Sequence, residues 1–134
     1  MIDPKELRLE NLLWLPGINR FVKVSAIFKT HFRCQDFDGI SFDESIRVNY
    51  QPVELTPDIL EAAGCKKDVI DGWNLWVNGN LFVIRKLVSS NGYTISVGDY
   101  CLCDMEYLHT FQNAYNLLTG QELQIDLQKL NKQP

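Results

Sequence analysis

Apolar and polar residues alternate in short runs over the first 55 positions, and turn-forming residues separate the runs. This pattern is typical of β-strands, because successive side chains of a strand point to opposite faces of the sheet. Pro16-Gly17 and Asp38-Gly39 are strong turn signals, and Asp-Gly suits a tight hairpin. Pro52 places the last run at a sheet edge if that run pairs. The predicted strands are residues 12–15, 21–28, 31–35, 40–42 and 48–55.

A short helix is predicted near the middle of the chain. Thr56 is a suitable N-cap, and Pro57 suits the first helical position because its missing N–H is not needed there. Ile59 and Leu60 supply apolar contacts, and Gly64 can end the helix. The signals at both ends agree, so the expected helix is about two turns long.

A β-meander is predicted after this helix. Residues 73–77 and 81–86 flank Asn78-Gly79, a turn sequence whose conformation matches the twist of the flanking strands. Residues 93–97 form a third run of the same type. These segments are therefore expected to pair as neighbouring antiparallel strands.

Residues 104–120 predict one complete amphipathic helix. Asp104 can cap its N-terminus, and Gly120 can adopt the left-handed conformation that ends many helices. One face is apolar, whereas the other has hydrogen-bonding side chains without the Lys and Glu of an ordinary solvated helix. Residues 123–127 alternate like a final strand. The apolar face contains Tyr107, Leu108, Phe111, Ala114, Tyr115 and Leu118, and the polar face contains His109, Gln112, Asn113 and Asn116.

Together these elements predict an α+β fold. We expect a small β-barrel or sheet in the N-terminal half, a short helix, a β-meander and a C-terminal amphipathic helix. A chain of 134 residues has the size of one domain. We therefore expect a single domain over residues 1–134, with residues 1–55 and 56–134 as its lobes if it is divided.

The charge of the chain is unevenly distributed. The net charge of −4 and the pI of about 5.1 argue against sequence-independent nucleic-acid binding, which depends on a basic surface. Residues 11–35 nevertheless contain no acidic residue, whereas residues 36–61 contain seven against Arg47 alone. A fold that keeps these segments apart would have a positive patch. The cations of the first segment are Arg20, Lys23, Lys29 and Arg33.

The N-terminus lacks the basic start and apolar core of a signal peptide, and no apolar run approaches membrane-spanning length. We therefore expect a cytoplasmic protein that does not contact a membrane. In that reducing compartment the four cysteines are expected to be free thiols. Cys101 and Cys103 are expected on the same side of a strand, which is a poor geometry for a disulfide between them.

The sequence contains few signals for metal or catalytic chemistry. Cys101, Cys103 and His109, with Cys34 or His31, lack the paired spacing of structural zinc sites. The segment 36–39 and the acidic residues after it do not match a calcium loop, because the glycine comes too early. No phosphate-binding glycine loop or nucleophile motif is present. We expect no metal, no cofactor and no enzymatic activity, and an enzyme built from dispersed residues is the third hypothesis.

The segment 20–33 interleaves its four cations with Phe21, Phe28 and Phe32. Small barrels can bind single-stranded nucleic acid by stacking bases on exposed aromatic rings in a positive groove. The alternation instead favours aromatic rings that mostly face the core and cations that are solvated. Nucleic-acid binding through Arg20, Lys23, Lys29 and Arg33 is therefore the alternative hypothesis.

The polar face of residues 104–120 allows two interpretations. His109, Gln112, Asn113 and Asn116 could form a docking surface for another protein or a second copy, since uncharged groups cost less to desolvate than charges. The amides could instead bond to backbone groups of the same chain, as most buried side-chain amides do. The second interpretation is favoured, and the first is kept.

Three stretches of the chain together carry a resemblance to a known family: residues 6–12, residues 55–60 with Gly64, and residues 108–123. In this order and spacing they resemble a family of short uncharacterised phage- and prophage-associated proteins of gut anaerobic bacteria. The resemblance spans most of the chain and implies a mobile-element origin. The first stretch is similar to the opening of a small SH3-like barrel. Glu10 stands where that family more often has Gly, and Cys65 where an aromatic residue commonly follows the glycine.

The resemblance implies no site residues. The leading hypothesis is therefore a non-enzymatic accessory protein of phage or mobile-element origin, which acts through a protein partner or self-association. Nucleic-acid binding by residues 20–33 is the alternative, and an uncharacterised enzyme comes third.

Overall fold

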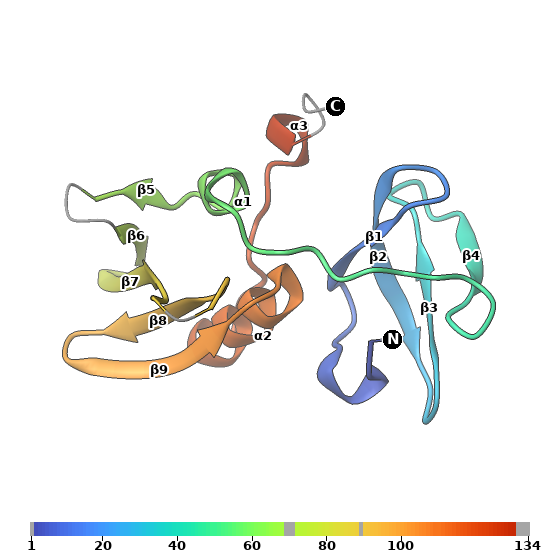
Figure 1. Ribbon diagram of the computed structural model, residues 1–134, viewed down its shortest axis with the longest axis horizontal. Coiled ribbons are helices and arrows are strands. Elements are labelled where there is room, and N and C mark those ends of the chain that lie inside the picture. The colour runs from blue at the N-terminus through green and yellow to red at the C-terminus, as the bar shows by residue number, and fades with distance from the viewer. Residues whose placement is uncertain (1, 69–71, 89, 131–134) are drawn as a thin grey trace. The chain divides into compact units, whose positions relative to one another are not determined.

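The computed structural model describes residues 2–68, 72–88 and 90–130. These residues form an α+β fold with two antiparallel sheets, which confirms the predicted fold class (Figure 1). The chain divides into two compact units. Unit 1 contains Met1–Val53 and Tyr107–Asn113, and unit 2 contains Glu54–Glu106 and Ala114–Pro134.

Unit 1 is built on a four-stranded antiparallel sheet whose strands pair in sequence order. A short 3-10 helix, η1 (Pro4–Glu6), precedes the sheet. The first four predicted strands are confirmed to within two residues at each end, since their alternation places one apolar face on the core. The strands are β1 (Leu12–Leu15), β2 (Arg20–Ile27), β3 (Phe32–Gln35) and β4 (Ser41–Glu44).

Of the predicted small barrel or sheet, the structure shows a sheet, and within the described residues this sheet of unit 1 does not close into a barrel. The order β1-β2-β3-β4 leaves β1 and β4 without pairing to each other. Residues 48–55, predicted as an edge strand, form no strand but pair at an isolated bridge between Trp14 and Gln51. Pro52 follows this bridge and has no N–H to extend the ladder. The SH3-like closure implied by the resemblance is therefore absent from this part of the chain.

One face of this sheet forms the core of unit 1. Antiparallel partners share a face, and the pairs Leu13 with Val22 and Val24 with Cys34 are all buried. Tyr50 and the N-terminal Ile2 complete the core from outside the sheet. The buried core residues are Ile2, Leu7, Leu13, Leu15, Val22, Val24, Phe32, Cys34 and Tyr50.

Unit 2 contains a five-stranded antiparallel meander. The predicted Asn78-Gly79 hairpin is confirmed, since both residues have the positive φ angles, 51° and 83°, that this turn requires. The strands are β5 (Lys66–Lys67), β6 (Gly72–Val77), β7 (Asn80–Lys86), β8 (Tyr93–Val97) and β9 (Tyr100–Met105).

The predicted short helix is confirmed as α1 (Pro57–Ala62). The Thr56 hydroxyl accepts a hydrogen bond from the backbone N–H of Ile59 at 3.3 Å, which satisfies one of the free donors at the helix start. Ile59 and Leu60 are buried against unit 2. A short C-terminal helix, α3 (Leu127–Leu130), packs on α1, and the N–H of Asp126 donates to the carbonyl of Ala62 at 2.8 Å.

The predicted boundaries of the long helix are wrong at its start and right at its end. Asp104 lies in β9, where it pairs with Thr94 and does not cap a helix. The helix α2 (Leu108–Thr119) begins four residues later, where the N–H of Leu108 donates to the carbonyl of Val53. Gly120 has a φ of 72° and follows the last turn, as expected.

The predicted final strand over residues 123–127 is also wrong. No strand is formed there, and the apolar Leu123 is buried without pairing into a sheet. The alternating pattern therefore reflects packing of single side chains, since Ile125 and Leu127 are half-buried as well. Among the described residues, no helix is both long and apolar enough to cross a membrane.

The four cysteines are free thiols, as predicted, but the expected arrangement of Cys101 and Cys103 is wrong. A bulge in β9 pairs Cys103 with Ile95 and Cys101 with the adjacent Ser96. Adjacent residues of β8 point to opposite faces, so the two cysteines do too. Cys101 is exposed and lies 2.8 Å from the hydroxyl of Thr94.

Glu10 occupies a tight turn in the left-handed region, with a φ of 75°. This conformation costs a non-glycine residue about 1–2 kcal/mol. We expect Glu10→Gly to be more stable to urea unfolding than Glu10→Ala by about 1 kcal/mol. Both variants lose the exposed ion pair of Glu10 with Lys23, so the comparison isolates the backbone term. Equal stability of the two variants would show that the turn carries no such cost.

Candidate functional site

The structure buries half of the predicted polar face of α2. His109 is 1% exposed and Gln112 is 3% exposed, whereas Asn113 and Asn116 are half-buried. The first two turns of α2 are therefore covered on their amide side as well as on the apolar side that contains Leu108 and Phe111. Residues 107–113 of this helix belong to unit 1, together with the N-terminal segment that they contact.

The amides of Gln112 and Asn113 bond to the segment 6–12. The side-chain oxygen of Gln112 accepts from the N–H of Leu12 at 2.8 Å, and its amide nitrogen donates to the carbonyl of Glu10 at 3.4 Å. Asn113 accepts from the buried Asn11 side chain at 2.8 Å and donates to the carbonyl of Glu6 at 3.0 Å. These bonds satisfy backbone groups that would otherwise be costly to bury.

His109 contacts the same segment through a carboxylate. Its Nε2 lies 3.3 Å from Oε1 of Glu6, and its ring stacks on Tyr107 with centroids 5.6 Å apart. Burial lowers the pKa of His109 from its ordinary value, and the carboxylate of Glu6 acts in the opposite direction. The second ring nitrogen, Nδ1, is buried and has no hydrogen-bond partner in the described part of the chain.

These contacts match the favoured interpretation of the amide face. Gln112 and Asn113 hold the segment 6–12 onto α2, and Asn116 donates to the carbonyl of Gln121 in its own chain at 3.2 Å. The buried side chains of His109 and Gln112 are not available on the surface of the folded unit. These contacts account for the amides without a partner. Docking of a partner on His109, Gln112, Asn113 and Asn116 therefore stays a prediction.

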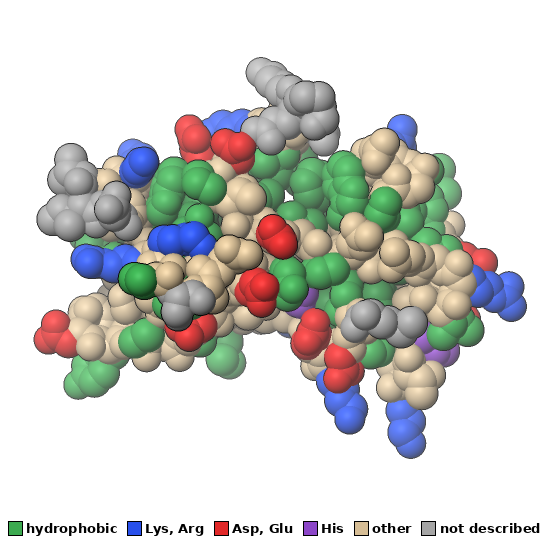
Figure 2. Space-filling view, in the orientation of Figure 1, with side chains coloured by type: hydrophobic (Ala, Val, Ile, Leu, Met, Phe, Trp, Pro, Cys, Tyr) green, Lys and Arg blue, Asp and Glu red, His purple; other side chains and the backbone are tan. Residues whose placement is uncertain are grey.

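The structure does not gather the four predicted cations of residues 20–33. Arg20 begins β2 and Lys29 lies beyond its other end, and a strand of this length spans roughly 23 Å. Lys23 and Arg33 lie on the same outer face of the sheet, because Lys23 pairs with Gln35, two positions from Arg33. In the part of Figure 2 that shows unit 1, Lys and Arg side chains stand apart.

The central pair of these cations is engaged within unit 1. Nζ of Lys23 lies 3.5 Å from the Glu10 carboxylate and 5.8 Å from the centroid of the Phe37 ring. The guanidinium of Arg33 lies 5.9 Å from the Phe28 ring centroid. Arg33 also pairs across the sheet with Glu44. The fold therefore brings the acidic segment against the basic one, which is why the predicted positive patch does not form here.

A different cationic region is present in unit 2. A pocket of about 700 Å³ is lined by three exposed cations, Lys67, Arg85 and Lys86, and by the aromatic rings of Trp73 and Tyr93. Figure 2 shows Lys and Arg side chains around apolar surface where Figure 1 places β5 and β6. Its other lining residues are Pro57, Leu87 and Val88.

A second pocket of about 490 Å³ shares Lys67 and Trp73 with the first. It adds the exposed cations Lys66 and Lys129, and α3 contributes the latter by packing on α1. Glu61 is the acidic residue among its lining residues. We call the two pockets together the cationic surface. Its cations are Lys66, Lys67, Arg85, Lys86 and Lys129, and its aromatic residues are Trp73 and Tyr93.

Strand register explains how residues far apart in sequence reach this surface. Lys67 pairs with Trp73, and Trp73 pairs with Ile84, so these side chains share one face of the sheet. Lys86 lies two residues after Ile84 and pairs with Tyr93, which places both on that same face. Lys67 with Trp73 and Lys86 with Tyr93 are therefore two separate pairs of lining residues on one face, supplied by β5 to β8. Lys66 and Arg85 are their neighbours in sequence, so the same register starts these two side chains from the other face of the sheet.

The cations of this surface differ in how they are held. Nζ of Lys86 donates to the carbonyl of Ser90 at 3.1 Å and lies 5.1 Å from the Tyr93 ring centroid, so its ammonium group is fixed. Lys66, Lys67 and Arg85 form no ion pair within the described residues. Within this part of the chain, no acidic side chain neutralises these three charges.

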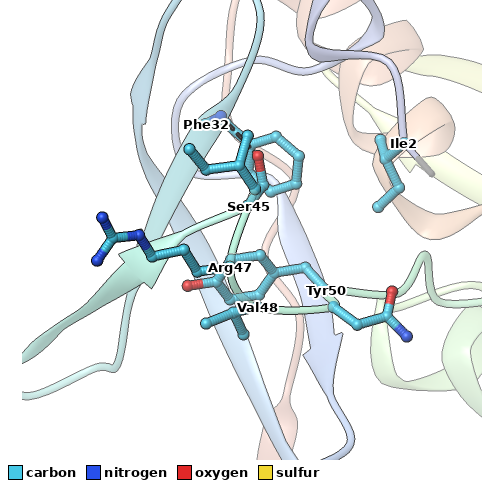
Figure 3. A pocket seen from close by; sticks show the side chains of 8 residues that line it. Ile2, Phe32, Ser45, Arg47, Val48 and Tyr50 are labelled. Carbon is cyan, nitrogen blue, oxygen red and sulfur yellow. Dashed lines mark hydrogen bonds between the residues drawn. The ribbon is translucent and has the colours of Figure 1, made fainter.

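A smaller cavity of about 220 Å³ lies in unit 1. Figure 3 shows Ile2 facing Phe32 and Tyr50 across it, while the guanidinium of Arg47 extends away from Phe32 and Ile2. Its walls are polar and apolar in about equal parts, and its volume lies below the usual range for small-molecule sites. Because this cavity is small, we assign it no role.

The described residues contain no group of three or more His, Cys, Asp or Glu side chains that could hold a metal ion. Cys65 lines the smaller pocket of the cationic surface, but its burial raises the pKa of the thiol to about 12. A thiol with that pKa is a poor nucleophile near neutral pH. No protein-family model, curated protein or solved structure matches this chain.

Proposed function

We propose that the protein is a non-enzymatic binding protein whose ligand is a polyanion, held by the cationic surface of unit 2. One observation carries this proposal. Unit 2 contains six Lys and Arg residues in its sequence, and five of them line the two adjoining pockets. The same unit contains ten acidic residues in its sequence. Among the described residues, Glu61 is the one acidic residue that lines a pocket, and it lines the smaller pocket.

Concentrating cations in this way has an electrostatic cost in the free protein. Like charges held close together repel, and proteins usually relieve this repulsion with neighbouring acidic residues. Unit 2 has acidic residues in excess, yet Lys66, Lys67 and Arg85 have no ion-pair partner among the described residues. A ligand with several negative charges would remove the repulsion, and Lys and Arg are the residues that bind phosphate and carboxylate groups.

The residues of the surface favour binding over catalysis. Its ionisable groups are cations, Glu61, the buried Tyr93 and the Cys65 thiol, whose raised pKa suits a packing role. His109, the buried histidine, is held against Glu6 in unit 1. A protein partner, self-association and a mobile-element origin stay predictions, as does nucleic-acid contact through Arg20, Lys23, Lys29 and Arg33.

Charge reversal at the cationic surface tests the proposal. We expect Lys67→Glu/Arg85→Glu to weaken binding of inorganic polyphosphate by about tenfold or more at low salt. Each cation that binds a phosphate displaces counterions from the ligand, so the double variant displaces fewer of them and gains less free energy on binding. Arg20→Glu/Lys29→Glu is the matched control, since it changes the net charge equally at exposed positions of unit 1. Calorimetric titration measures both affinities.

The proposal predicts that the control variant binds within about twofold of the unaltered protein, since charges that do not contact the ligand act only through a screened field. Equal losses in the two double variants would show that net charge alone determines binding. Absence of polyphosphate binding by the unaltered protein at low salt would overturn the proposal.

A further inference from the structure

We infer that the polyanion is a single-stranded nucleic acid, with one base stacked on Trp73 between two groups of phosphate-binding cations. This inference rests on the proposed function and adds the class of ligand. Its starting observation is that Trp73 lines both pockets of the cationic surface.

Trp73 lies between two sets of positive charge. Arg85 and Lys86 line the larger pocket, Lys66 and Lys129 line the smaller one, and Lys67 lines both. A charged chain that crosses the half-buried Trp73 would therefore meet cations before and after the ring. Single-strand binding sites combine these two elements, a positive track for the backbone and an aromatic ring for a base.

The position of Trp73 suits a stacking platform. Its backbone is paired on both sides, with Lys67 of β5 and Ile84 of β7, so its indole is attached to a central strand of the sheet. The larger pocket, about 700 Å³, has room for roughly twenty non-hydrogen atoms, which is the size of one nucleotide. Tyr93 is only 4% exposed and covered by Lys86, so it supports the pocket and does not stack.

The geometry distinguishes three classes of polyanion. Inorganic polyphosphate and an acidic peptide can pair with the cations but offer no aromatic face to the indole. A duplex presents its phosphates, but its bases are stacked on one another and unavailable to Trp73. A single strand offers phosphates and unstacked bases together, so it alone uses every group of the surface.

The test compares ligands and two tryptophan variants. The probes are a labelled single-stranded oligonucleotide, its duplex, polyphosphate and poly-glutamate. Trp73→Leu removes the proposed platform, and Trp76→Leu is the matched control. Trp76 lies three residues along the same strand, pairs with Leu81 and is 64% exposed on the opposite face of the sheet. Thermal unfolding of each variant reports whether it is folded.

We expect the single strand to bind at least tenfold more tightly than the duplex or poly-glutamate. Trp73→Leu should weaken single-strand binding by about tenfold or more and leave polyphosphate binding unchanged, whereas Trp76→Leu should change neither. Trp73→Phe, which keeps an aromatic face, should restore most of the affinity. If Trp73→Leu does not fold, Trp14→Phe/Trp76→Phe leaves Trp73 as the sole tryptophan, and the single strand should quench its fluorescence.

Several outcomes would overturn the inference while polyphosphate still binds. They are equal affinity for single strand and duplex, equal affinity for poly-glutamate, full single-strand affinity in folded Trp73→Leu, or an unquenched Trp73. Loss of polyphosphate binding itself would instead overturn the proposed function. The two failures are therefore distinguishable in one set of titrations.

Discussion

Phe32→Ala is expected to lower the free energy of unfolding by about 3–5 kcal/mol, the usual cost of removing a buried aromatic side chain. Phe32 is 1% exposed and packs against Tyr50 with ring centroids 5.5 Å apart. Its replacement by Ala leaves a cavity next to an existing one, since Phe32 also lines the small cavity of unit 1. Urea unfolding followed by fluorescence measures the loss.

Phe37→Ala is the matched control for this prediction. Phe37 is the same residue type in the same unit, but it is 51% exposed and contacts Lys23 by its ring face. We expect its replacement to cost less than about 1 kcal/mol, because most of the ring is already in water. Similar losses for the two variants would contradict the assignment of Phe32 to the core and Phe37 to the surface.

Gln112→Ala is expected to cost about 2–4 kcal/mol. The change leaves the buried N–H of Leu12 without its acceptor, and an unsatisfied buried group costs about 1–3 kcal/mol. It also removes four buried side-chain atoms and the weaker bond to the carbonyl of Glu10, and the cavity adds to the loss. Asn116→Ala, on the same helix, should cost less than about 1 kcal/mol, since its partner is the exposed carbonyl of Gln121.

The same pair of variants separates the two interpretations of the amide face. If Gln112 holds the segment 6–12 in place, its loss lowers stability whether or not a partner is present. If Gln112 serves docking, its replacement should leave the unfolding transition unchanged and weaken association. Equal stability of Gln112→Ala and Asn116→Ala would therefore contradict the structural role that its hydrogen bonds indicate.

Local patterns predicted most of the strands and one helix correctly. Asn78-Gly79 and Thr56-Pro57 carry their information within a few residues, so both hairpin and helix could be recognised without tertiary contacts. The start of α2 was missed for the opposite reason. Asp104 is a good cap in isolation, but pairing with Thr94 extends the backbone there, and the strand prevails over the local cap signal.

The open sheet of unit 1 could not be predicted from alternation alone. Residues 48–55 contain apolar positions typical of a strand, but they form only isolated bridges, at Gln51 and Glu54. The hydrogen-bond partners of the amides could not be predicted from local sequence either, since Gln112 and Asn113 bond to residues about a hundred positions earlier. Sequence analysis could identify these amides as unusual, and only the fold shows where their bonds go.

The cationic surface was missed because its charges are divided along the chain. Lys66-Lys67 and Lys129 have acidic residues nearby in sequence, and Arg85-Lys86 is an isolated pair of cations, whereas residues 11–35 form one long run without acids that contains four cations. Antiparallel pairing of β5, β6 and β7 brings the separate groups together, and pairing of β3 with β4 places Glu44 opposite Arg33. The two pairs of adjacent cations were the recognisable feature in the sequence. Arg85-Lys86 ends the predicted strand of residues 81–86, and Lys66-Lys67 forms the short strand β5.

The most direct test of the central claim is an NMR titration of the protein with inorganic polyphosphate at low salt. Polyphosphate binding at the cationic surface predicts that the largest backbone amide shifts occur at Lys66, Lys67, Trp73 and Arg85, with small shifts over residues 20–33. Shifts confined to residues 20–33, or no shifts at all, would contradict the claim that unit 2 holds the binding site.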